Sequence, residues 1–393
     1  MRRPASTRRR QPALTCLGGL AALALLAGCG GSDEPEKPAP ARLAPVPSFA
    51  IGIDEKNPHL LAPGEQPAPF GRFRDALVAL KPTYVRVLVD WSTVQKSASA
   101  PPVFTERKDG CARAQPPCAP FDGIRDTLRA VAAMPARPVI LIYGTPAWAA
   151  RAPEGCEGEE VTPWARMPDL DAYRALVRSI VAMAREDGIA IPYFSPWNEP
   201  NSPIFFNPQR RACDIGARSL APARYAQLAR VMADEVGLGH VLLGEAVGIT
   251  RHTGATGAAE LAAALPDDLV CGAAAWAQHA YVTSPLDEGR DYKAVPPADN
   301  AAIVGGVEAA LDGHDCDHEV PVWITETGAG GRRPAACPAM AAQLRAWRAD
   351  PRIKAAFQYT MRDDPIFPTG LADIGLTRLY PAYEAWRTRG ASC

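Results

Sequence analysis

The stretch Ile191-Pro192-Tyr193-Phe194-Ser195-Pro196-Trp197-Asn198-Glu199-Pro200 joins an apolar run to a polar, acidic turn. A second stretch has the same form, because the run 320–325 (VPVWIT) ends on Glu326. A short apolar run bounded by loop residues is typical of a strand that is buried on both faces. Each glutamate therefore stands at the C-terminal end of an expected strand.

Apolar runs of this kind recur along the chain and alternate with amphipathic stretches. The runs are 49–53, 84–89, 138–143, 191–197, 240–247, 273–281, 320–325 and 353–360. Helices are predicted over 72–80, 124–133, 170–186, 222–235, 301–311, 338–348 and 380–387, and 250–263 is the least clear of them. Strands that alternate with helices predict an α/β fold, here a single (β/α)8 TIM barrel. The alternative is a doubly wound open sheet, but no Gly-rich phosphate loop follows an early strand.

The first residues predict export and lipid attachment. Residues 1–28 hold five arginines and no acid, followed by the apolar stretch from Ala13 to Gly28, which is typical of a secretory signal peptide. Leu26-Ala27-Gly28-Cys29 resembles a bacterial lipobox, which implies cleavage before Cys29 and a lipid anchor on its thiol, with the protein held outside the cytoplasm at the cell membrane. Residues 29–47 would form a flexible tether and 48–393 the barrel. The alternative is an ordinary signal peptide followed by an unrelated cysteine.

Charge and cysteine content disfavour two kinds of site. Five of the 42 basic residues lie in the signal segment, so 37 basic and 43 acidic residues remain, a net charge of −6. The sequence has no basic patch, and we expect no nucleic-acid partner. Eight cysteines remain beyond the anchor, an even number that favours disulfides, and none is spaced Cys-x-x-Cys, which disfavours zinc. We expect the pairs Cys111–Cys118, Cys156–Cys213, Cys271–Cys316 and Cys337–Cys393.

Two glutamates at the same rim of a barrel form a pair that can break a glycosidic bond. Catalytic residues of a TIM barrel come from the C-terminal ends of its strands. A retaining glycosidase needs one general acid/base and one nucleophile, and we assign these roles to Glu199 and Glu326. No Gly-x-Ser-x-Gly motif is present, which disfavours a serine hydrolase.

Four polar residues are candidates for the surroundings of this pair. Arg86, in the middle of the run 84–89, is costly to bury without a carboxylate, so we expect it to pair with Glu326; a structural ion pair lower in the barrel is the alternative. Asn198 would donate to the sugar hydroxyl beside the reacting carbon, or else satisfy loop backbone. His279 and Tyr281 share one face of a strand, with Tyr281 directed toward Glu326 and His279 toward substrate. The alternative for both is an ordinary hydrogen bond in the core.

Aromatic rings near the expected rim are candidates for stacking on sugar rings. Three tryptophans lie at strand ends or just beyond them: Trp91, Trp148 and Trp197. Trp276 and Trp323 lie inside expected strands and could equally serve packing. Trp347 and Trp386, on expected helices, are predicted to be core residues.

Together these positions resemble the clan A glycoside hydrolases, a large (β/α)8 group. The resemblance covers nearly the whole barrel and rests on Arg86, Trp197-Asn198-Glu199-Pro200-Asn201, His279-x-Tyr281 and Thr325-Glu326-Thr327-Gly328. The second of these motifs is most similar to family 39, with family 5 close behind. The resemblance implies net retention through a glycosyl-enzyme intermediate, an oligosaccharide or polysaccharide substrate, and no metal or organic cofactor. Many clan members end the last strand with a tryptophan; here the segment 357–364 reads FQYTMRDD, and Tyr359 is the candidate for that place.

Other classes of protein stay open on the sequence. A sugar-binding lipoprotein without activity could use the same barrel, although it would have no need of two carboxylates in this arrangement. A transport-type solute-binding lipoprotein would show two lobes, whereas this chain has one uninterrupted βα alternation. A transglycosylase would use the same residues as a hydrolase and pass the sugar to another acceptor. We expect a monomer.

Overall fold

The computed structural model describes residues 45–156, 161–212, 214, 216–248, 254–282, 297–330, 332, 334–365 and 367–393, without the side chains of 297–299. The fold lies in the unit Pro40–Cys393. The predicted signal peptide, Cys29 and most of the predicted tether lie outside the described residues. Among the helices in the described ranges, none has both the length and the apolar character needed to cross a membrane.

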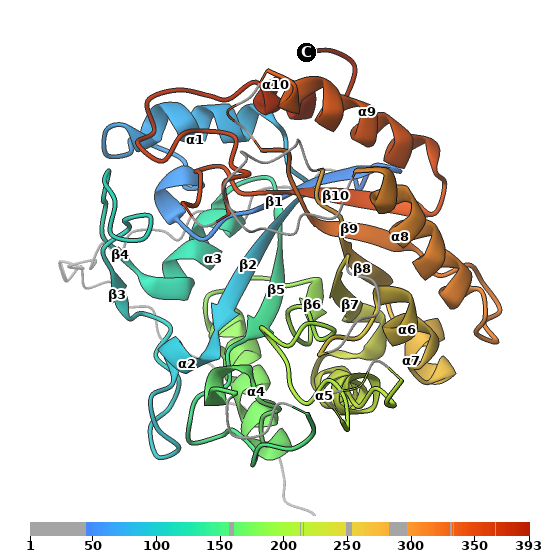
Figure 1. Ribbon diagram of the computed structural model, residues 1–393. Coiled ribbons are helices and arrows are strands. Elements are labelled where there is room, and N and C mark those ends of the chain that lie inside the picture. The colour runs from blue at the N-terminus through green and yellow to red at the C-terminus, as the bar shows by residue number, and fades with distance from the viewer. Residues whose placement is uncertain are drawn as a thin grey trace, which may run out of the picture. The chain divides into compact units, whose positions relative to one another are not determined.

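Eight parallel strands form a barrel surrounded by helices (Figure 1). In chain order the strands are β1 (Ala50–Asp54), β2 (Tyr84–Asp90), β5 (Arg137–Tyr143), β6 (Tyr193–Ser195), β7 (Leu242–Val247), β8 (Ala275–His279), β9 (Val322–Thr327) and β10 (Ile353–Tyr359). The order in the sheet is β6-β5-β2-β1-β10-β9-β8-β7, and a parallel bridge between Phe194 and Val241 joins the two end strands. Beyond this bridge the N–H of Glu199 donates to the carbonyl of Glu245 (3.0 Å). The predicted (β/α)8 barrel is confirmed.

Large aromatic side chains fill the inside of the barrel below the strand ends. The ring centroid of Tyr84 lies 4.8 Å from that of Trp323 and 5.9 Å from that of Phe357. Position 52 on β1 is a glycine because the Phe357 ring occupies the space beside it: a Cβ atom on Gly52 would lie 2.2 Å from that ring. One layer of side chains nearer the strand ends, Asp54 of β1 pairs in register with Arg86 of β2. The aromatic layer is therefore the floor beneath a polar layer.

The helices cover the outside of the barrel. They are α1 (Phe70–Ala79), α2 (Trp91–Val94), α3 (Gly123–Ala133), α4 (Leu170–Glu186), α5 (Ala221–Val236), α6 (Ala258–Ala263), α7 (Asp267–Gly272), α8 (Pro297–Leu311), α9 (Ala336–Ala349) and α10 (Ala382–Arg387). Short 3-10 turns are η1 (Pro58–Leu60), η3 (Pro163–Ala165) and η4 (Leu238–His240). Helix α4 shows how the sequence directs them: Asp169 caps its start by accepting from the N–H groups of Asp171 and Ala172. Its buried residues recur at three- and four-residue spacing, on one face: Tyr173, Leu176, Val177, Ile180 and Met183.

The predicted elements agree closely with the observed ones. Each of the eight predicted runs overlaps a barrel strand, and each predicted helix overlaps an observed helix. The unclear stretch 250–263 includes α6, while its beginning lies outside the described residues. Four helices and strands of the described residues were not predicted: α2, α7 and the short antiparallel pair of β3 (Arg107–Lys108) and β4 (Phe121–Asp122); the 3-10 turns were not predicted either. These elements are too short to show a periodic pattern.

Disulfides connect segments outside the strands. Cys111–Cys118 closes a loop between β3 and β4, Cys271–Cys316 joins α7 to the segment before β9, and Cys337–Cys393 joins α9 to the C-terminus. These three predicted pairs are confirmed. Cys213, and with it the predicted pair Cys156–Cys213, lies outside the described residues.

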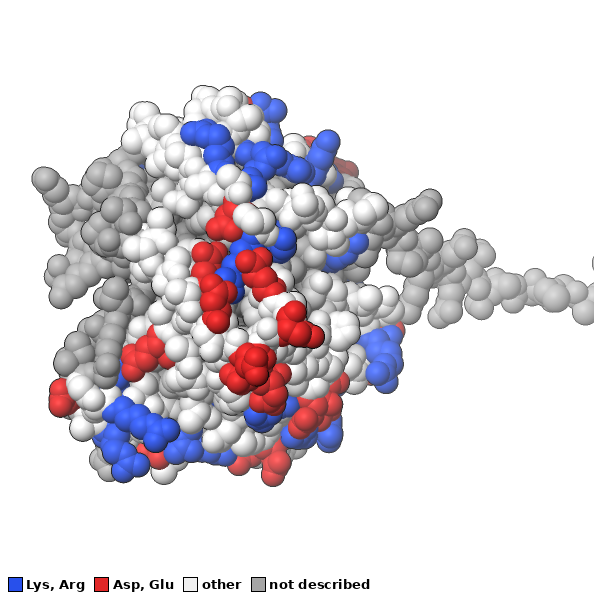
Figure 2. All heavy atoms as spheres, turned by 90° about the vertical axis from the view of Figure 1, so that its right-hand side faces the viewer, with Lys and Arg blue, Asp and Glu red and all other residues white. Residues whose placement is uncertain are grey.

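Charged side chains of both signs share the face of the barrel that Figure 2 shows. Asp and Glu side chains gather along the middle of this face, and Lys and Arg side chains lie among them and toward its upper and lower edges. A nucleic-acid backbone is bound by a continuous basic surface. The charges on this face are instead mixed.

The close contact between Gly52 and Phe357 gives a stability prediction. Replacing Gly52 by Ala should lower the free energy of unfolding by about 1–3 kcal/mol, because the added methyl group forces the Phe357 ring out of its layer. Gly305→Ala in α8 is the matched control: its Cβ would meet nothing within 4 Å, so it should stabilise the helix by roughly 0.8–1 kcal/mol. Thermal unfolding of the soluble barrel measures both. An unchanged midpoint for Gly52→Ala would contradict the packing described here.

Candidate active site

Arg86 lies at the centre of the polar layer, and its side chain is 0% exposed. Its guanidinium donates from Nη1 to Glu326 Oε1 (2.7 Å) and Asp54 Oδ1 (3.1 Å), and from Nη2 to Glu245 Oε2 (3.0 Å). Burial alone would lower the pKa of Arg86, but the three carboxyl groups raise it well above its ordinary value. The predicted pair of Arg86 with Glu326 is confirmed.

The alternation of side chains along β2 explains the inward direction of Arg86. Successive side chains of a strand point to opposite faces. Val85 and Val87 pack outward against the helices, whereas Tyr84 belongs to the barrel interior. Arg86 therefore shares the inward face with Tyr84, one layer nearer the end of the strand.

Glu245 reaches the same layer through a bulge in β7. Leu242 faces the interior and Leu243 faces the helices, so strict alternation would turn Glu245 outward. The pairing of β7 with β8 shifts beside Gly244, where φ is +95°, and φ of Glu245 is +49°. This extra residue turns Glu245 inward. A Cβ atom on Gly244 would lie 2.6 Å from a backbone oxygen of β8, so the bulge requires glycine.

Two charged residues of the site, Glu245 and Asp54, were not predicted from the sequence. The available signal was an acidic residue inside or directly after an apolar run, at 240–247 and 49–53 respectively. Asp54 follows its run directly, as Glu326 does, so this signal would have been enough to predict Asp54 as a site residue. For Glu245 it was not, because the direction of its side chain depends on the bulge.

His279, the last residue of β8, stands between three carboxyl groups. Its Nδ1 lies 3.0 Å from Glu199 Oε1 and 3.4 Å from Glu326 Oε2, and its Nε2 lies 2.9 Å from Glu245 Oε2. Burial lowers the pKa of His279, but the carboxyl groups outweigh burial and raise it to about 10. Both ring nitrogens thus face carboxyl groups of the protein. The geometry places His279 between these three carboxyl groups, and its contact with substrate stays a prediction.

Four donors surround the carboxylate of Glu245. The Ser195 hydroxyl donates to Oε1, and Thr325 Oγ1 (2.6 Å), Arg86 Nη2 and His279 Nε2 donate to Oε2. Burial raises the pKa of Glu245, but Arg86 and His279 lower it by a larger amount, so that the pKa is about 2. Glu245 is therefore ionised throughout the neutral range.

Glu199 and Glu326 lie in different environments. The Glu199 side chain is 13% exposed, and burial raises its pKa while the hydrogen bond with His279 opposes this rise. Glu326 accepts from Arg86 at Oε1 and from the Tyr281 hydroxyl at Oε2 (2.8 Å). The predicted direction of Tyr281 toward Glu326 is confirmed. One oxygen of Glu199 and one of Glu326 lie within 4.8 Å of each other.

A metal ion fits this cluster poorly, although the spacing alone would allow one. Glu199, His279 and Glu326 each place a potential ligand atom within 4.8 Å of the others. A histidine ligates metals through a neutral ring nitrogen, whereas both nitrogens of His279 already lie within hydrogen-bond distance of carboxyl groups, Glu199 at Nδ1 and Glu245 at Nε2. Arg86 already supplies a second positive charge beside Glu326. The donor set is that of an ion-pair network.

Two of the three tryptophans predicted to stack on sugar rings cannot do so. Trp91 and Trp197 are each 0% exposed. Trp91 packs edge-on against Trp148, and Trp197 packs against Tyr173 of α4, so both rings are covered by neighbouring aromatic side chains. Trp148 is half-buried and packs against the same cluster. A position at the end of a strand does not exclude helices or loops from covering a ring.

Half-buried aromatic side chains gather in two groups near the strand ends. One group joins Tyr143 at the end of β5 to Trp164 and Phe205, with the Tyr143 and Trp164 centroids 5.6 Å apart. The other joins Tyr281, Tyr359 and Phe367. Of these, Tyr281 and Tyr359 were predicted from the sequence. Tyr143 was not, although it ends the apolar run 138–143 and could have been identified from that position.

Two further residues named from the sequence adjoin the network. Asn198 Oδ1 accepts from Arg86 Nη2 at 3.4 Å, which places Asn198 beside Glu199 in the polar layer. The ring centroid of Tyr359 lies 6.4 Å from that of Tyr281, which donates to Glu326, and burial raises the pKa of Tyr359. Contact of Asn198 or Tyr359 with substrate stays a prediction.

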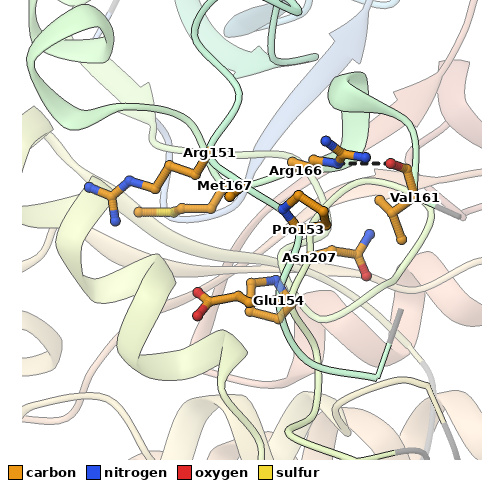
Figure 3. Close-up of a pocket in the computed structure, with 9 residues that line it drawn as sticks. Arg151, Pro153, Glu154, Val161, Arg166, Met167 and Asn207 are labelled. Carbon is orange, nitrogen blue, oxygen red and sulfur yellow. Dashed lines mark hydrogen bonds between the residues drawn. The ribbon is translucent and has the colours of Figure 1, made fainter. Parts of the chain in front are cut away.

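A small hollow lies between the loops that follow β5 and β6 (Figure 3). Arg151, Glu154 and Arg166 line it, and Arg166 Nε donates to the Val161 carbonyl (2.8 Å) across its rim. Its volume is about 10 Å³, which is the space of one water molecule. It is too small for a sugar.

Comparisons with known proteins match the fold. No family model matches this sequence, and no curated protein matches it. Among solved structures, GH5_18 from Streptomyces cattleya in complex with GlcNAc is 16% identical over 88% of this chain and 80% of that chain, with a TM-score of 0.53. GH5_18 from Bifidobacterium longum subsp. longum ATCC 55813 is 15% identical over 88% and 79%, with a TM-score of 0.54.

A third similar structure is the exo-beta-1,4-mannosidase Op5Man5 from Opitutaceae bacterium strain TAV5. It is 16% identical with a TM-score of 0.51, and the match covers 87% of this chain but only 58% of the mannosidase. The likeness is one of fold. It agrees with the resemblance to clan A drawn from the sequence, and family 5 is represented among these structures.

The charges around Arg86 predict a pH-dependent loss of stability when this residue is replaced. Arg86→Met should lower the free energy of unfolding by about 3–5 kcal/mol near neutral pH, because it leaves buried carboxylates without a cation. In the wild type, the pKa of about 2 for Glu245 gives a stabilisation that is complete above its ordinary value near 4.5 and is lost as the pH falls toward 2. The loss caused by the variant should therefore be smaller at about pH 4.

Urea unfolding at the two pH values measures this difference. Arg178→Met is the control, because Arg178 is 65% exposed in its pair with Glu235 and should contribute less than about 1 kcal/mol. An Arg86→Met variant as stable as the control would show that the network does not carry the barrel's stability.

Proposed function

We propose that this protein is a retaining glycoside hydrolase that cleaves O-glycosidic bonds by double displacement. The observation that carries the proposal is the separation of two carboxyl groups: an oxygen of Glu199 lies within 4.8 Å of an oxygen of Glu326. Retaining enzymes hold their carboxyl groups about 5–5.5 Å apart, whereas inverting enzymes leave about 6.5–9.5 Å for a water molecule. The short separation favours attack by a protein carboxylate.

Glu199 is suited to be the general acid/base. Its burial raises the pKa, which favours a proton on the carboxyl group before reaction. In the first step this proton passes to the leaving oxygen as the glycosidic bond breaks. In the second step the Glu199 carboxylate removes a proton from water, whose oxygen bonds to the anomeric carbon.

Glu326 is suited to be the nucleophile. Arg86 and Tyr281 donate to its two oxygens at 2.7 and 2.8 Å, which orients the carboxylate and stabilises its negative charge. In the first step an oxygen of Glu326 bonds to the anomeric carbon, and in the second step that bond breaks as water attacks. Two inversions at one carbon give net retention.

The substrate class that fits this site is an oligosaccharide or polysaccharide. Aromatic side chains of both groups, Tyr143 with Trp164 and Tyr281 with Tyr359, lie near the strand ends, where ring faces can stack on sugars. Similar structures include an exo-beta-1,4-mannosidase and an endo-beta1,6-glucanase, which differ in sugar and linkage. We therefore propose a class of substrate, an oligosaccharide or polysaccharide, and no particular sugar or linkage.

The same proposal places the enzyme outside the cytoplasm on a lipid anchor. The support is the sequence Leu26-Ala27-Gly28-Cys29 after an apolar stretch with basic residues before it. Disulfides such as Cys271–Cys316 suit an oxidising compartment. An anchored enzyme would meet glycans at the cell surface.

Variants of the two glutamates test the assigned roles. Glu326→Gly should abolish turnover of aryl glycosides, and added azide should then give a glycosyl azide of inverted configuration from an activated substrate. Glu199→Ala should slow substrates with poor leaving groups by about 10²–10⁴-fold and spare the first step of activated ones, which need little protonation. With azide it should give the retained glycosyl azide. NMR of the products distinguishes the two configurations.

Glu384→Gln is the matched control, because Glu384 pairs with Arg387 on the surface and should keep wild-type activity. Activity at the wild-type level in both active-site variants would refute the roles assigned to Glu199 and Glu326. Binding of glycans without turnover across a broad panel of aryl glycosides and polysaccharides would instead indicate a sugar-binding protein.

The lipid anchor has a separate test. In a bacterial host the full chain should partition with membranes and carry a lipid-modified N-terminal peptide by mass spectrometry. Cys29→Ser should leave the fold intact and abolish the modification, since the thiol is the attachment atom. An unmodified Cys29 in the wild-type protein would contradict the anchor.

A further inference from the structure

Glu245 is a buried charged group that the two-step chemistry does not use. Neither general acid/base nor nucleophile, it nonetheless has the most complete set of donors in the described site: Ser195, Thr325, Arg86 and His279. It is 0% exposed, so it does not face substrate. Its positive φ of +49° is also a conformation that non-glycine residues rarely adopt. Burying this charge and holding its backbone at positive φ both cost free energy, and strain of this kind clusters at functional sites, so we expect Glu245 to have a function.

The contact that distinguishes Glu245 is the one with His279. A neutral imidazole has one N–H donor and one acceptor nitrogen. His279 meets Glu245 at Nε2 (2.9 Å) and Glu199 at Nδ1 (3.0 Å). The Glu245 carboxylate lies at Nε2 and the Glu326 carboxylate lies 3.4 Å from Nδ1, so a neutral ring would turn a lone pair toward one of these anions even while Glu199 carries its proton on Oε2. A ring protonated at both nitrogens donates to both, and the geometry selects that form.

The other charged groups around His279 are compatible with this state. Arg86 of β2 lies 3.4 Å from Nε2, and Glu326 of β9 lies 3.4 Å from Nδ1. Asp54 of β1 meets the ring only through Arg86, and Tyr281, two residues further along the chain, donates to Glu326. Arg86 opposes a positive charge on the ring. The anionic group on the Nε2 side, which offsets Arg86, is Glu245.

We propose, on the basis of the glycosidase function proposed above, that Glu245 is a positioning residue that keeps His279 doubly protonated and directed at Glu199. When Glu199 gives its proton to the leaving oxygen, it becomes a carboxylate that faces an imidazolium N–H. It then takes a proton from the attacking water and returns to its starting state. His279 keeps both protons throughout. Glu245 thus acts on the acid/base through His279, without touching substrate.

The variant Glu245→Gln tests this role, since it keeps the shape of the side chain and removes its charge. Without the charge of Glu245, His279 should lose a proton more readily and with it the positive charge beside Glu199. The pKa of the Glu199 carboxyl group should then rise. With an activated aryl glycoside at saturation, where removal of the sugar from Glu326 limits the rate, the acid limb of kcat should move to higher pH. A shift of about one pH unit lowers kcat roughly tenfold below the limb.

The control is Ser195→Ala, which removes one hydrogen bond to Glu245 but leaves its charge and its contact with His279. Its pH limbs should stay in place. A purely structural Glu245 would lower the activity of Glu245→Gln equally at every pH and leave the limbs unmoved, and that outcome overturns the proposal. Absence of any wild-type turnover would instead count against the glycosidase function itself.

A second readout needs no substrate. In ¹⁵N-histidine NMR of the wild type, the His279 ring, assigned by its loss in His279→Asn, should stay doubly protonated to about pH 10. In Glu245→Gln it should lose a proton at lower pH. A wild-type His279 that titrates near the ordinary histidine value of about 6.5 would overturn the proposal whether or not the variant folds.

Discussion

The positive charge of Arg86 inside the barrel is the constraint on which the site depends. A buried cation is stable only with anionic partners and hydrogen bonds in good geometry. The ring of strands supplies them from three places: Asp54 on β1, Glu245 on β7 and Glu326 on β9. One guanidinium thereby fixes the distances between segments that are far apart in the chain. The same contacts orient Glu326 and lead through Glu245 to the remaining polar groups of the site.

The surrounding packing makes this network rigid. The aromatic layer of Tyr84, Trp323 and Phe357 fills the barrel beneath the charges, so the charged layer rests on close-packed rings. Above it, the backbone of Glu199 (φ +40°) and of Glu245 (φ +49°) takes a conformation that is costly for residues other than glycine. Such strain persists only where the surrounding structure enforces it, and it clusters at functional sites. Fixed groups of this kind stabilise developing charge without having to reorganise.

The proposed chemistry depends on the site and not on the fold. Structures that share about one residue in six with this chain have the same barrel, and barrels of this type host many reactions. The two carboxyl groups differ in their surroundings: burial raises the pKa of Glu199, whereas Glu326 accepts hydrogen bonds from Arg86 and Tyr281. Two carboxyl groups held in unlike surroundings can take opposite roles in one reaction.

The sequence by itself determined the barrel and its two principal carboxyl groups. Strands buried on both faces leave a local record, a short apolar run, and Glu199 and Glu326 were visible because each follows such a run. Only the tertiary structure revealed Glu245 as a site residue, because the bulge that turns it inward depends on the register of β7 against β8. It likewise showed that Trp91 and Trp197 are covered by other rings. A local pattern records which residues are apolar or acidic, but the direction of a side chain and the cover over a ring are set by packing between segments distant in the chain.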